Sequence, residues 1–234
     1  MNPVGRPDQI GVLGGMGPLA TADFLSKLVR ATPVARDQDH LPVVVASLPQ
    51  IPCRQAAARG EGESPAAALI AVRRLLEGAG ARCLAMPCNA AHLWYDQLVE
   101  GCSVPFLHIV DAAAQALGDR DRVGIVASPA TLRSRLYADR LDALGVRCVE
   151  PTEAAAQDVV DAIARIKIGD VAGAAPGLGR AIEAQLEAGA QAVILACTEL
   201  PLALPYLTAD LAAHSIDATD ALARACVRWG LAQR

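Results

Sequence analysis

Aromatic side chains and runs of basic residues are scarce in this chain. Aromatic types make up 3% of its 234 residues, too few for the stacking platforms on which single-stranded nucleic acids bind. The formal net charge is −4, and no run of lysine or arginine forms a basic patch against it. We therefore expect no nucleic-acid partner.

Long apolar runs are also missing. No stretch reaches the roughly 20 residues that a membrane-spanning helix needs, because glycine, proline and charged residues interrupt every candidate. The stretch from Met1 to Asp8 lacks the apolar core of a secretory signal. The seven cysteines are odd in number and widely spread, which fits thiols in a reducing compartment. These features predict a cytoplasmic protein with no membrane partner.

The usual patterns of metal ligands are absent as well. There is no CxxC pair, and the four histidines follow no zinc spacing. We therefore expect no metal site.

Short apolar segments alternate with amphipathic ones along the chain. This rhythm, with strands that are apolar throughout, is typical of parallel sheets covered by helices on both faces. The sequence thus predicts an α/β fold. The expected strands are residues 9–13, 43–47, 83–86, 106–110, 122–126, 146–150 and 192–196, and the expected helices are residues 18–31, 65–79, 91–100, 111–117, 130–144, 155–167, 177–188 and 217–229. Prolines after Ser64 and Ser128, together with Pro176, are expected in first helical turns.

The pattern occurs twice. The strand and turn around Gly11 resemble those around Gly124, 113 residues later, and the strand that ends at Cys88 resembles the strand that ends at Cys197, 109 residues later. Two similar offsets suggest two related α/β halves. We expect an N-terminal domain of residues 1–112 plus 213–234, with the C-terminal helix packed back on it, and a second domain of residues 113–212.

Cys88 and Cys197 each close an apolar strand and precede a helix that begins with polar residues. Ligands of open parallel sheets bind beyond the carboxyl ends of strands, and helix N-termini favour thiolate over thiol. The two thiols could therefore exchange protons near neutral pH. The alternative is that both are small buried core residues, as most unpaired cysteines are. Cys83, Cys148 and Cys226 fit core positions, and Cys102 fits an exposed turn.

The glycine-rich segment from Gly14 to Ala20 follows the first strand and contains a G-x-G-x-x-A match. A nicotinamide-binding fold also needs an acidic residue at the end of the second strand, and the segment from Val43 to Pro49 has none. We therefore favour a backbone cradle for a carboxylate over a cofactor loop.

Three further side chains have both a functional and a structural interpretation. Arg54 lies in a proline-rich loop where a guanidinium could clamp a carboxylate, or it could be a solvated surface residue. Lys167 could bind an anion, or it could complement the dipole of its helix. His92 lies one turn after Cys88, where capping, packing and catalysis are all open.

Together these segments resemble the aspartate/glutamate racemase family of cofactor-independent amino-acid racemases. The resemblance runs from Gln9 to about Trp229. It rests on five motifs in order, namely Gly11 to Thr21, Arg36-Asp37-Gln38, Pro49-Gln50-Ile51-Pro52, Met86-Pro87-Cys88-Asn89 with Ala91-His92, and Ala196-Cys197-Thr198-Glu199. It implies two pseudo-symmetric domains with the active site in the cleft between them, no cofactor, an acidic amino-acid substrate and a homodimer.

By this resemblance Cys88 and Cys197 are the acid/base pair, one on each face of the substrate Cα. The implied substrate-binding residues are Met16, Gln50, Arg54, Asn89, Ala90, Lys167, Thr198 and Glu199. Two positions depart from the family pattern, because Ala90 replaces a threonine and Cys53 replaces an aspartate. We expect racemisation of an acidic amino acid, aspartate first among them. The alternatives are a racemase of broader or different specificity, glutamate included, and a non-catalytic amino-acid-binding protein.

Overall fold

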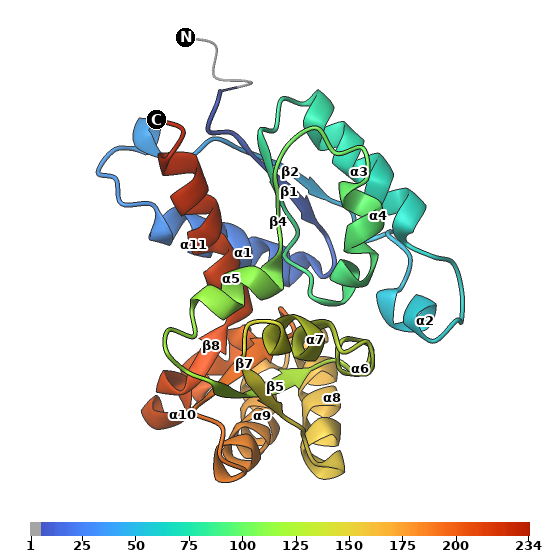
Figure 1. Cartoon of the computed structure of the whole chain (residues 1–234), viewed down its shortest axis with the longest axis vertical. Helices are drawn as coiled ribbons and strands as arrows, with labels where there is room; N and C mark the ends of the chain where they lie inside the picture. Colours follow the sequence, from blue (N-terminus) through green and yellow to red (C-terminus); the bar gives the residue numbers. More distant parts are fainter. Residues whose placement is uncertain (1–5) are drawn as a thin grey trace. The chain divides into compact units, whose positions relative to one another are not determined.

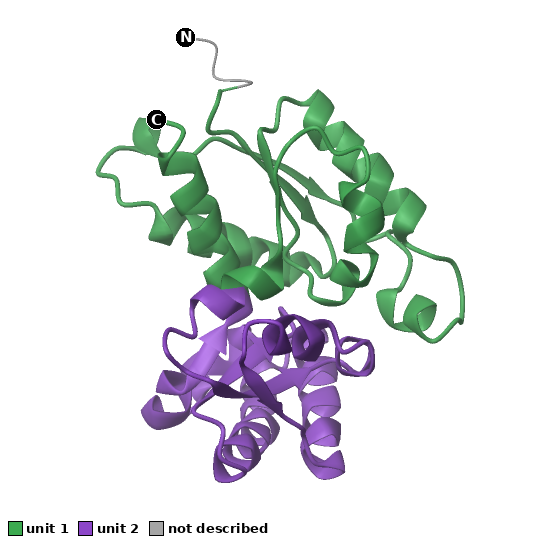
Figure 2. Cartoon of the chain, in the orientation of Figure 1, with its two compact units in different colours: residues 1–112, 219–234 green, residues 113–218 purple. Residues whose placement is uncertain are grey.

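A computed structural model describes residues 6–234, and the chain divides into two compact units (Figure 2). Residues 6–112 and 219–234 form unit 1, and residues 113–218 form unit 2. The sequence-based boundary lay at residue 212. The structure assigns residues 213–218 to unit 2 because this segment carries strand β8 (Ser215–Asp217), which pairs with the unit 2 strand β7 (Ala192–Ala196).

Unit 1 is built on a four-stranded parallel sheet. Its strands are β1 (Ile10–Gly14), β2 (Val43–Ser47), β3 (Cys83–Ala85) and β4 (Phe106–Leu107), in the order β2-β1-β3-β4. Helices α3 (Ala66–Gly78) and α4 (Tyr95–Val99) lie on one side of this sheet, and α1 (Pro18–Ala31) and α11 (Ala218–Leu231) lie on the other (Figure 1). The remaining elements are α2 (Arg54–Ala58), α5 (Ile109–Gln115) and the 3₁₀ helices Asp37–Asp39 and Ala90–Trp94.

Unit 2 repeats this plan. Strands β5 (Arg122–Ala127), β6 (Arg147–Val149), β7 and β8 form a parallel sheet in the order β6-β5-β7-β8. Its helices are α6 (Pro129–Arg133), α7 (Leu136–Asp142), α8 (Glu153–Lys167), α9 (Val171–Glu187) and α10 (Ala209–Ala213), with a 3₁₀ helix over Leu200–Tyr206. The predicted α/β class is confirmed.

The two sheets also share a register. Gly11 of β1 pairs with Leu84 of β3, and Gly124 of β5 pairs with Val193 of β7. Each cysteine then follows its paired residue by four positions, Cys88 after Leu84 and Cys197 after Val193. The repeat inferred from the sequence is therefore a repeat of structure.

The core of each unit follows the apolar strands. All five residues of β1 and of β7 are buried, and burying one aliphatic side chain of this kind contributes about 1.5–3 kcal/mol. In unit 2 the apolar faces of α8 and α9 pack on this sheet around Val159, Leu178 and Leu195. Thr152 and Asp170 cap these two helices through Ala155 N (3.2 Å) and Gly173 N (3.0 Å).

Several expected elements differ from the structure. Helix α9 begins at Val171, so Pro176 lies inside it rather than in its first turn; the Asp170 cap starts the helix upstream of the proline. The expected helix over 130–144 is interrupted where Arg135 has a φ of 56°. Strand β8 was not expected at all. No helix within residues 6–234 is long and apolar enough to span a membrane.

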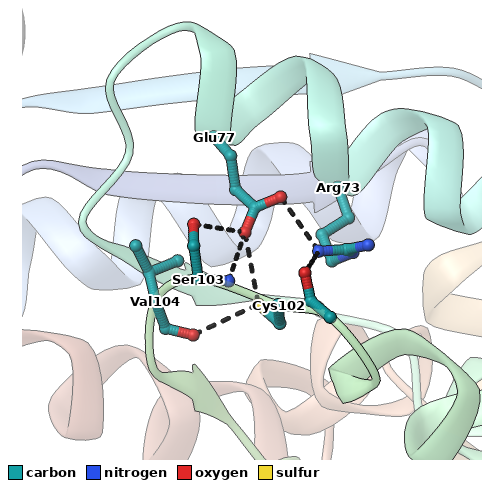
Figure 3. A network of polar contacts seen from close by, with 6 residues as sticks. Arg73, Glu77, Cys102, Ser103 and Val104 are labelled. Atoms are coloured by element: carbon teal, nitrogen blue, oxygen red, sulfur yellow. Dashed lines mark hydrogen bonds and ion pairs between the residues drawn. The ribbon is translucent and has the colours of Figure 1, made fainter.

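A buried ion pair fastens the loop before β4 to helix α3 (Figure 3). Arg73 is 3% exposed and donates to Glu77 (3.0 Å) and to the Gly101 carbonyl (2.8 Å). Glu77 also accepts from the Ser103 N–H (2.8 Å) and hydroxyl (2.9 Å). Cys102 was expected to be exposed, but it is half-buried, and its thiol donates to the Val104 carbonyl at 3.2 Å. The loop is therefore held by side chains from the helix.

Candidate active site

In unit 1, the loop after β1 is shaped by a close backbone approach. Gly15 has a φ of 93°, and a Cβ there would collide with the backbone of Leu48, so only glycine fits. The Gly15 N–H donates to Thr21 Oγ1 at 2.8 Å. This donor is thus used internally, and the expected backbone cradle for a carboxylate lacks it. The Met16 side chain, 3% exposed, packs in the same apolar cluster as Cys88.

Cys88 follows β3 at the carboxyl end of the sheet, the end at which the Gly14–Met16 loop follows β1. Its side chain is 5% exposed, and its backbone N–H donates to the Met86 carbonyl at 2.8 Å. Asn89 and Ala90, the next two residues, are 2% and 9% exposed and open a 3₁₀ helix. The thiol therefore lies where a strand ends and a helical turn begins, as expected from the sequence.

His92 ties the backbone of Cys88 to helix α5. Its Nδ1 lies 2.9 Å from the Cys88 carbonyl oxygen, and the Ile109 N–H donates to its Nε2 at 3.2 Å. A carbonyl can only accept, so Nδ1 carries the proton and the ring is neutral. The ring is 2% exposed and stacks on Tyr95 at 5.8 Å. Of the interpretations left open for His92, the structure favours capping and packing.

Arg54 is the first residue of α2, in the loop that follows β2. One guanidinium nitrogen donates to the carbonyls of Ile51 and Pro52, both at 3.0 Å. Its Nε is buried and has no hydrogen-bond partner. The side chain is therefore half-buried and oriented by its own loop rather than freely solvated. Gln50, in the same loop, is exposed.

In unit 2, Cys197 follows β7 and is 9% exposed. Its thiol donates to Glu199 Oε2 at 3.1 Å. Glu199 is 8% exposed, and Thr198 between them is 2% exposed. A carboxylate thus accepts a hydrogen bond from a buried thiol, an interaction that was not predicted from the sequence. The Cys-x-Glu spacing across the helix start is the signal that could have indicated it.

The carboxyl end of the unit 2 sheet holds other polar groups. Ser128 and Thr131 follow β5, are 6% and 2% exposed, and share a hydroxyl contact of 3.1 Å. Helix α9 leads into the start of β7, so its first residues lie toward the carboxyl end of that strand. Lys167, the last residue of α8, is joined to α9 by a short turn and lies exposed at the same end of the unit.

The remaining cysteines differ from this pair. Burial raises the pKa of Cys83 to about 12 and that of Cys148 to about 11, and it raises the pKa of Cys226 as well. Such thiols keep their protons at neutral pH. Cys83 and Cys226 are fully buried, whereas Cys148 is half-buried. These three side chains suit packing rather than proton transfer.

Comparison with known proteins decides the family. The family model described as Asp/Glu/Hydantoin racemase matches residues 13–226, which cover most of both units. The chain belongs to the Asp/Glu/Hydantoin racemase family. The resemblance inferred from the motifs is therefore confirmed. Membership makes the protein an amino-acid racemase, an isomerase of a family that works without pyridoxal phosphate.

Individual relatives agree with this family. The structure of the aspartate racemase of Picrophilus torridus is similar with a TM-score of 0.84 and 30% identity, over 95% of this chain and 94% of that one. The broad specificity amino-acid racemase RacX of Bacillus subtilis is 27% identical over 95% of this chain and 98% of its own length. The glutamate racemase RacE1 of Bacillus anthracis shares the fold, with a TM-score of 0.67 and 20% identity over 92% and 78% of the two chains.

Proposed function

We propose that this racemase interconverts the enantiomers of an acidic amino acid, aspartate first among them, with Cys88 and Cys197 as the two acid/base groups. The observation that carries the proposal is that the two cysteines occupy matching positions in the two sheets. Each lies just after the carboxyl end of a strand, four residues after the strand residue that pairs with Gly11 or Gly124. The name of the Picrophilus relative, at 30% identity, supports the choice of aspartate.

Inversion needs two groups because a single base that returned its own proton would restore the starting enantiomer. In the proposed step, one cysteine thiolate takes the proton from Cα as the C–H bond breaks. The other cysteine thiol gives its proton to the opposite face of the same carbon. Each such group contributes about 10² to 10⁴ in rate. The step leaves the first sulfur protonated and the second ionised, so no external oxidant or cofactor enters the balance.

The carbanion formed in this step must be stabilised by donors around the substrate carboxylates. Asn89 and Thr198, each directly after a catalytic cysteine, are proposed to hold the α-carboxylate, with backbone groups of Met16 and Ala90. Arg54 is proposed to bind the side-chain carboxylate. Its support is the buried Nε without a partner, on a guanidinium that its own loop already orients. Gln50, Lys167 and Glu199 complete the proposed set.

Hydrogen exchange tests the proposal directly. L-aspartate incubated with the enzyme in D₂O should gain deuterium at Cα as D-aspartate appears. Both signals should fall at least about 10²-fold in Cys88→Ala and in Cys197→Ala. The matched control is Cys102→Ala, which removes a thiol from a loop and should exchange like the wild type. Binding of aspartate without exchange by the wild-type protein would show that it is a sensor instead.

Broader specificity is a second candidate, favoured by the RacX relative and by the two departures from the family pattern, Cys53 and Ala90. A panel of amino acids that includes glutamate and alanine separates the two. If aspartate is the substrate, Arg54→Ala should raise KM for aspartate roughly 10- to 100-fold, the loss of a charge-assisted hydrogen bond. KM for alanine should stay nearly constant. An equal rise for both substrates would remove Arg54 from the proposed clamp.

A further inference from the structure

The two strand-end cysteines have different residues two positions downstream. In unit 2 this residue is Glu199, whose Oε2 lies 3.1 Å from Cys197 Sγ and accepts a hydrogen bond from the thiol. In unit 1 the matching residue is Ala90. Ala90 lies six residues after Leu84, as Glu199 lies six residues after Val193, the matching strand residue of unit 2. The methyl side chain of Ala90 cannot accept a hydrogen bond. At this position of the repeat, a carboxylate side chain thus follows Cys197 and a methyl group follows Cys88.

The surroundings of the Cys197 thiol reinforce this difference. Glu199 is 8% exposed, so its charge is poorly screened by water. Tyr137 of α7 is buried, and its pKa is raised by burial first and then by the nearness of Asp217 and Cys197. Ionising Cys197 would put a second negative charge 3.1 Å from a carboxylate oxygen, within the same unit as Asp217. Such a pair of like charges at short range is unfavourable.

We infer that Glu199 is a catalytic residue that keeps the proton on Cys197 in the resting enzyme. This inference rests on the proposed two-thiol mechanism and adds a direction to it. Cys197 begins the cycle as the acid and Cys88 as the base. When Cys88 has taken the Cα proton and Cys197 has given up its own, Glu199 faces a thiolate, which drives reprotonation of Cys197 as Cys88 releases its proton.

Alkylation without substrate tests this assignment, because iodoacetamide reacts with the thiolate and so measures its fraction. Rates at each cysteine are followed by peptide mass spectrometry, with Cys102 as the reference thiol. In the wild type, Cys88 should react faster than Cys197. In Glu199→Gln, which keeps the side-chain size but removes the charge, the Cys197 rate should rise at least about tenfold.

Two further variants separate electrostatics from misfolding. Glu199→Asp keeps a carboxylate on a shorter side chain and should restore much of the slow Cys197 rate. Glu183→Gln removes an exposed glutamate of α9 and should change nothing. A Cys197 rate in Glu199→Gln that is unchanged or lower would overturn the inference, and so would a wild type in which Cys197 reacts faster than Cys88.

The failures of the two proposals are distinguishable. Alkylation measures protonation of the resting protein and needs no turnover, so the Glu199 assignment can fail while Cys88→Ala and Cys197→Ala still abolish exchange. Full racemisation by Cys197→Ala would instead overturn the two-thiol mechanism, and with it the role of Cys197 as the acid.

Discussion

Cys88 in unit 1 and Cys197 in unit 2 occupy matching positions, yet they make different hydrogen bonds. The carbonyl of Cys88 binds the neutral ring of His92, which also caps helix α5. The thiol of Cys197 donates to Glu199. The sheet order and register have been kept in both units, whereas the side chains beyond the strand ends have diverged. A repeated scaffold can thus place two similar groups beside different hydrogen-bond partners.

The largest expected effect comes from replacing the sulfur in each unit in turn. Cys88→Ser and Cys197→Ser should each lower the rate of racemisation about 10³-fold or more, because a hydroxyl is a far weaker acid than a thiol. Slow loss of Cα label should survive for one enantiomer in the first variant and for the other enantiomer in the second. NMR in D₂O measures both. Undiminished racemisation by either variant would contradict the two-thiol mechanism.

The next effect concerns one ion pair from each unit, Arg73–Glu77 in unit 1, which is largely buried, and Arg180–Asp158 in unit 2, whose arginine is exposed. Arg73→Ala should cost about 3–5 kcal/mol, because it leaves Glu77 without its cation. Arg180→Ala breaks the pair with Asp158 between α8 and α9, where Arg180 is 61% exposed, and should cost less than about 1 kcal/mol. Both tryptophans, Trp94 and Trp229, lie in unit 1, so their fluorescence in urea reports the first variant. Circular dichroism reports the second, and equal losses would contradict the argument from burial.

A smaller effect should distinguish the loops after the central strands. Gly15 in unit 1 lies four residues after Gly11, and Ser128 in unit 2 lies four residues after Gly124. Of the two, Gly15 has a positive φ and Ser128 does not. Gly15→Ala should destabilise unit 1 by about 2–3 kcal/mol through strain and collision with Leu48. Ser128→Ala should cost about 1 kcal/mol, the worth of one hydroxyl contact. Urea unfolding compares them, and a Ser128→Ala loss as large as that of Gly15→Ala would contradict this reasoning.

The smallest effect is a pH dependence of unit 1. Burial alone would raise the pKa of Glu77, but hydrogen bonds from Ser103 and the charge of Arg73 hold it below its ordinary value. A carboxyl with a lowered pKa in the folded state adds stability above its ordinary pKa and loses it as pH falls. Glu77→Gln should therefore flatten the fall in unit 1 stability below about pH 4.5. Tryptophan fluorescence across pH checks this, and parallel curves for the two proteins would contradict it.

Much of this architecture could be predicted from the sequence because its signals are local. Helix α1 and strands β2 and β7 have the predicted bounds, since a proline at the helix start and uninterrupted apolar strands mark them. Strand β8 has only three residues, all partly exposed, and its pairing with β7 is tertiary. The start of helix α9 was predicted too late in the sequence, because Pro176 favoured a first helical turn there. The helix instead begins upstream, after the capping residue Asp170.

The candidate site likewise has features that could be predicted from the sequence and others that could not. The positions of Cys88 and Cys197 at strand ends follow from the order of strands and helices alone. The hydrogen bond from the Ile109 N–H to His92 could not be predicted, because Ile109 lies 17 residues away in the sequence. The Gly15 N–H was expected to serve a ligand, but it is used by Thr21, whose helix folds back on the loop. Hydrogen bonds that depend on rotamers and on folding of the chain are not encoded in local patterns.

Helix α11 has a consequence for biosynthesis. It returns the chain to unit 1 after all of unit 2, and it packs so closely that a Cβ at Gly230 would lie 2.5 Å from a Leu41 methyl carbon. Beyond it, Arg234 binds Asp8 at 2.9 Å, joining residues 226 positions apart. On the ribosome, unit 2 is synthesised in one continuous stretch and can fold as it emerges, whereas unit 1 must wait with an open core until α11 leaves the exit tunnel. A nascent chain stalled before residue 219 is thus a target for chaperones and proteases in its first half rather than its second.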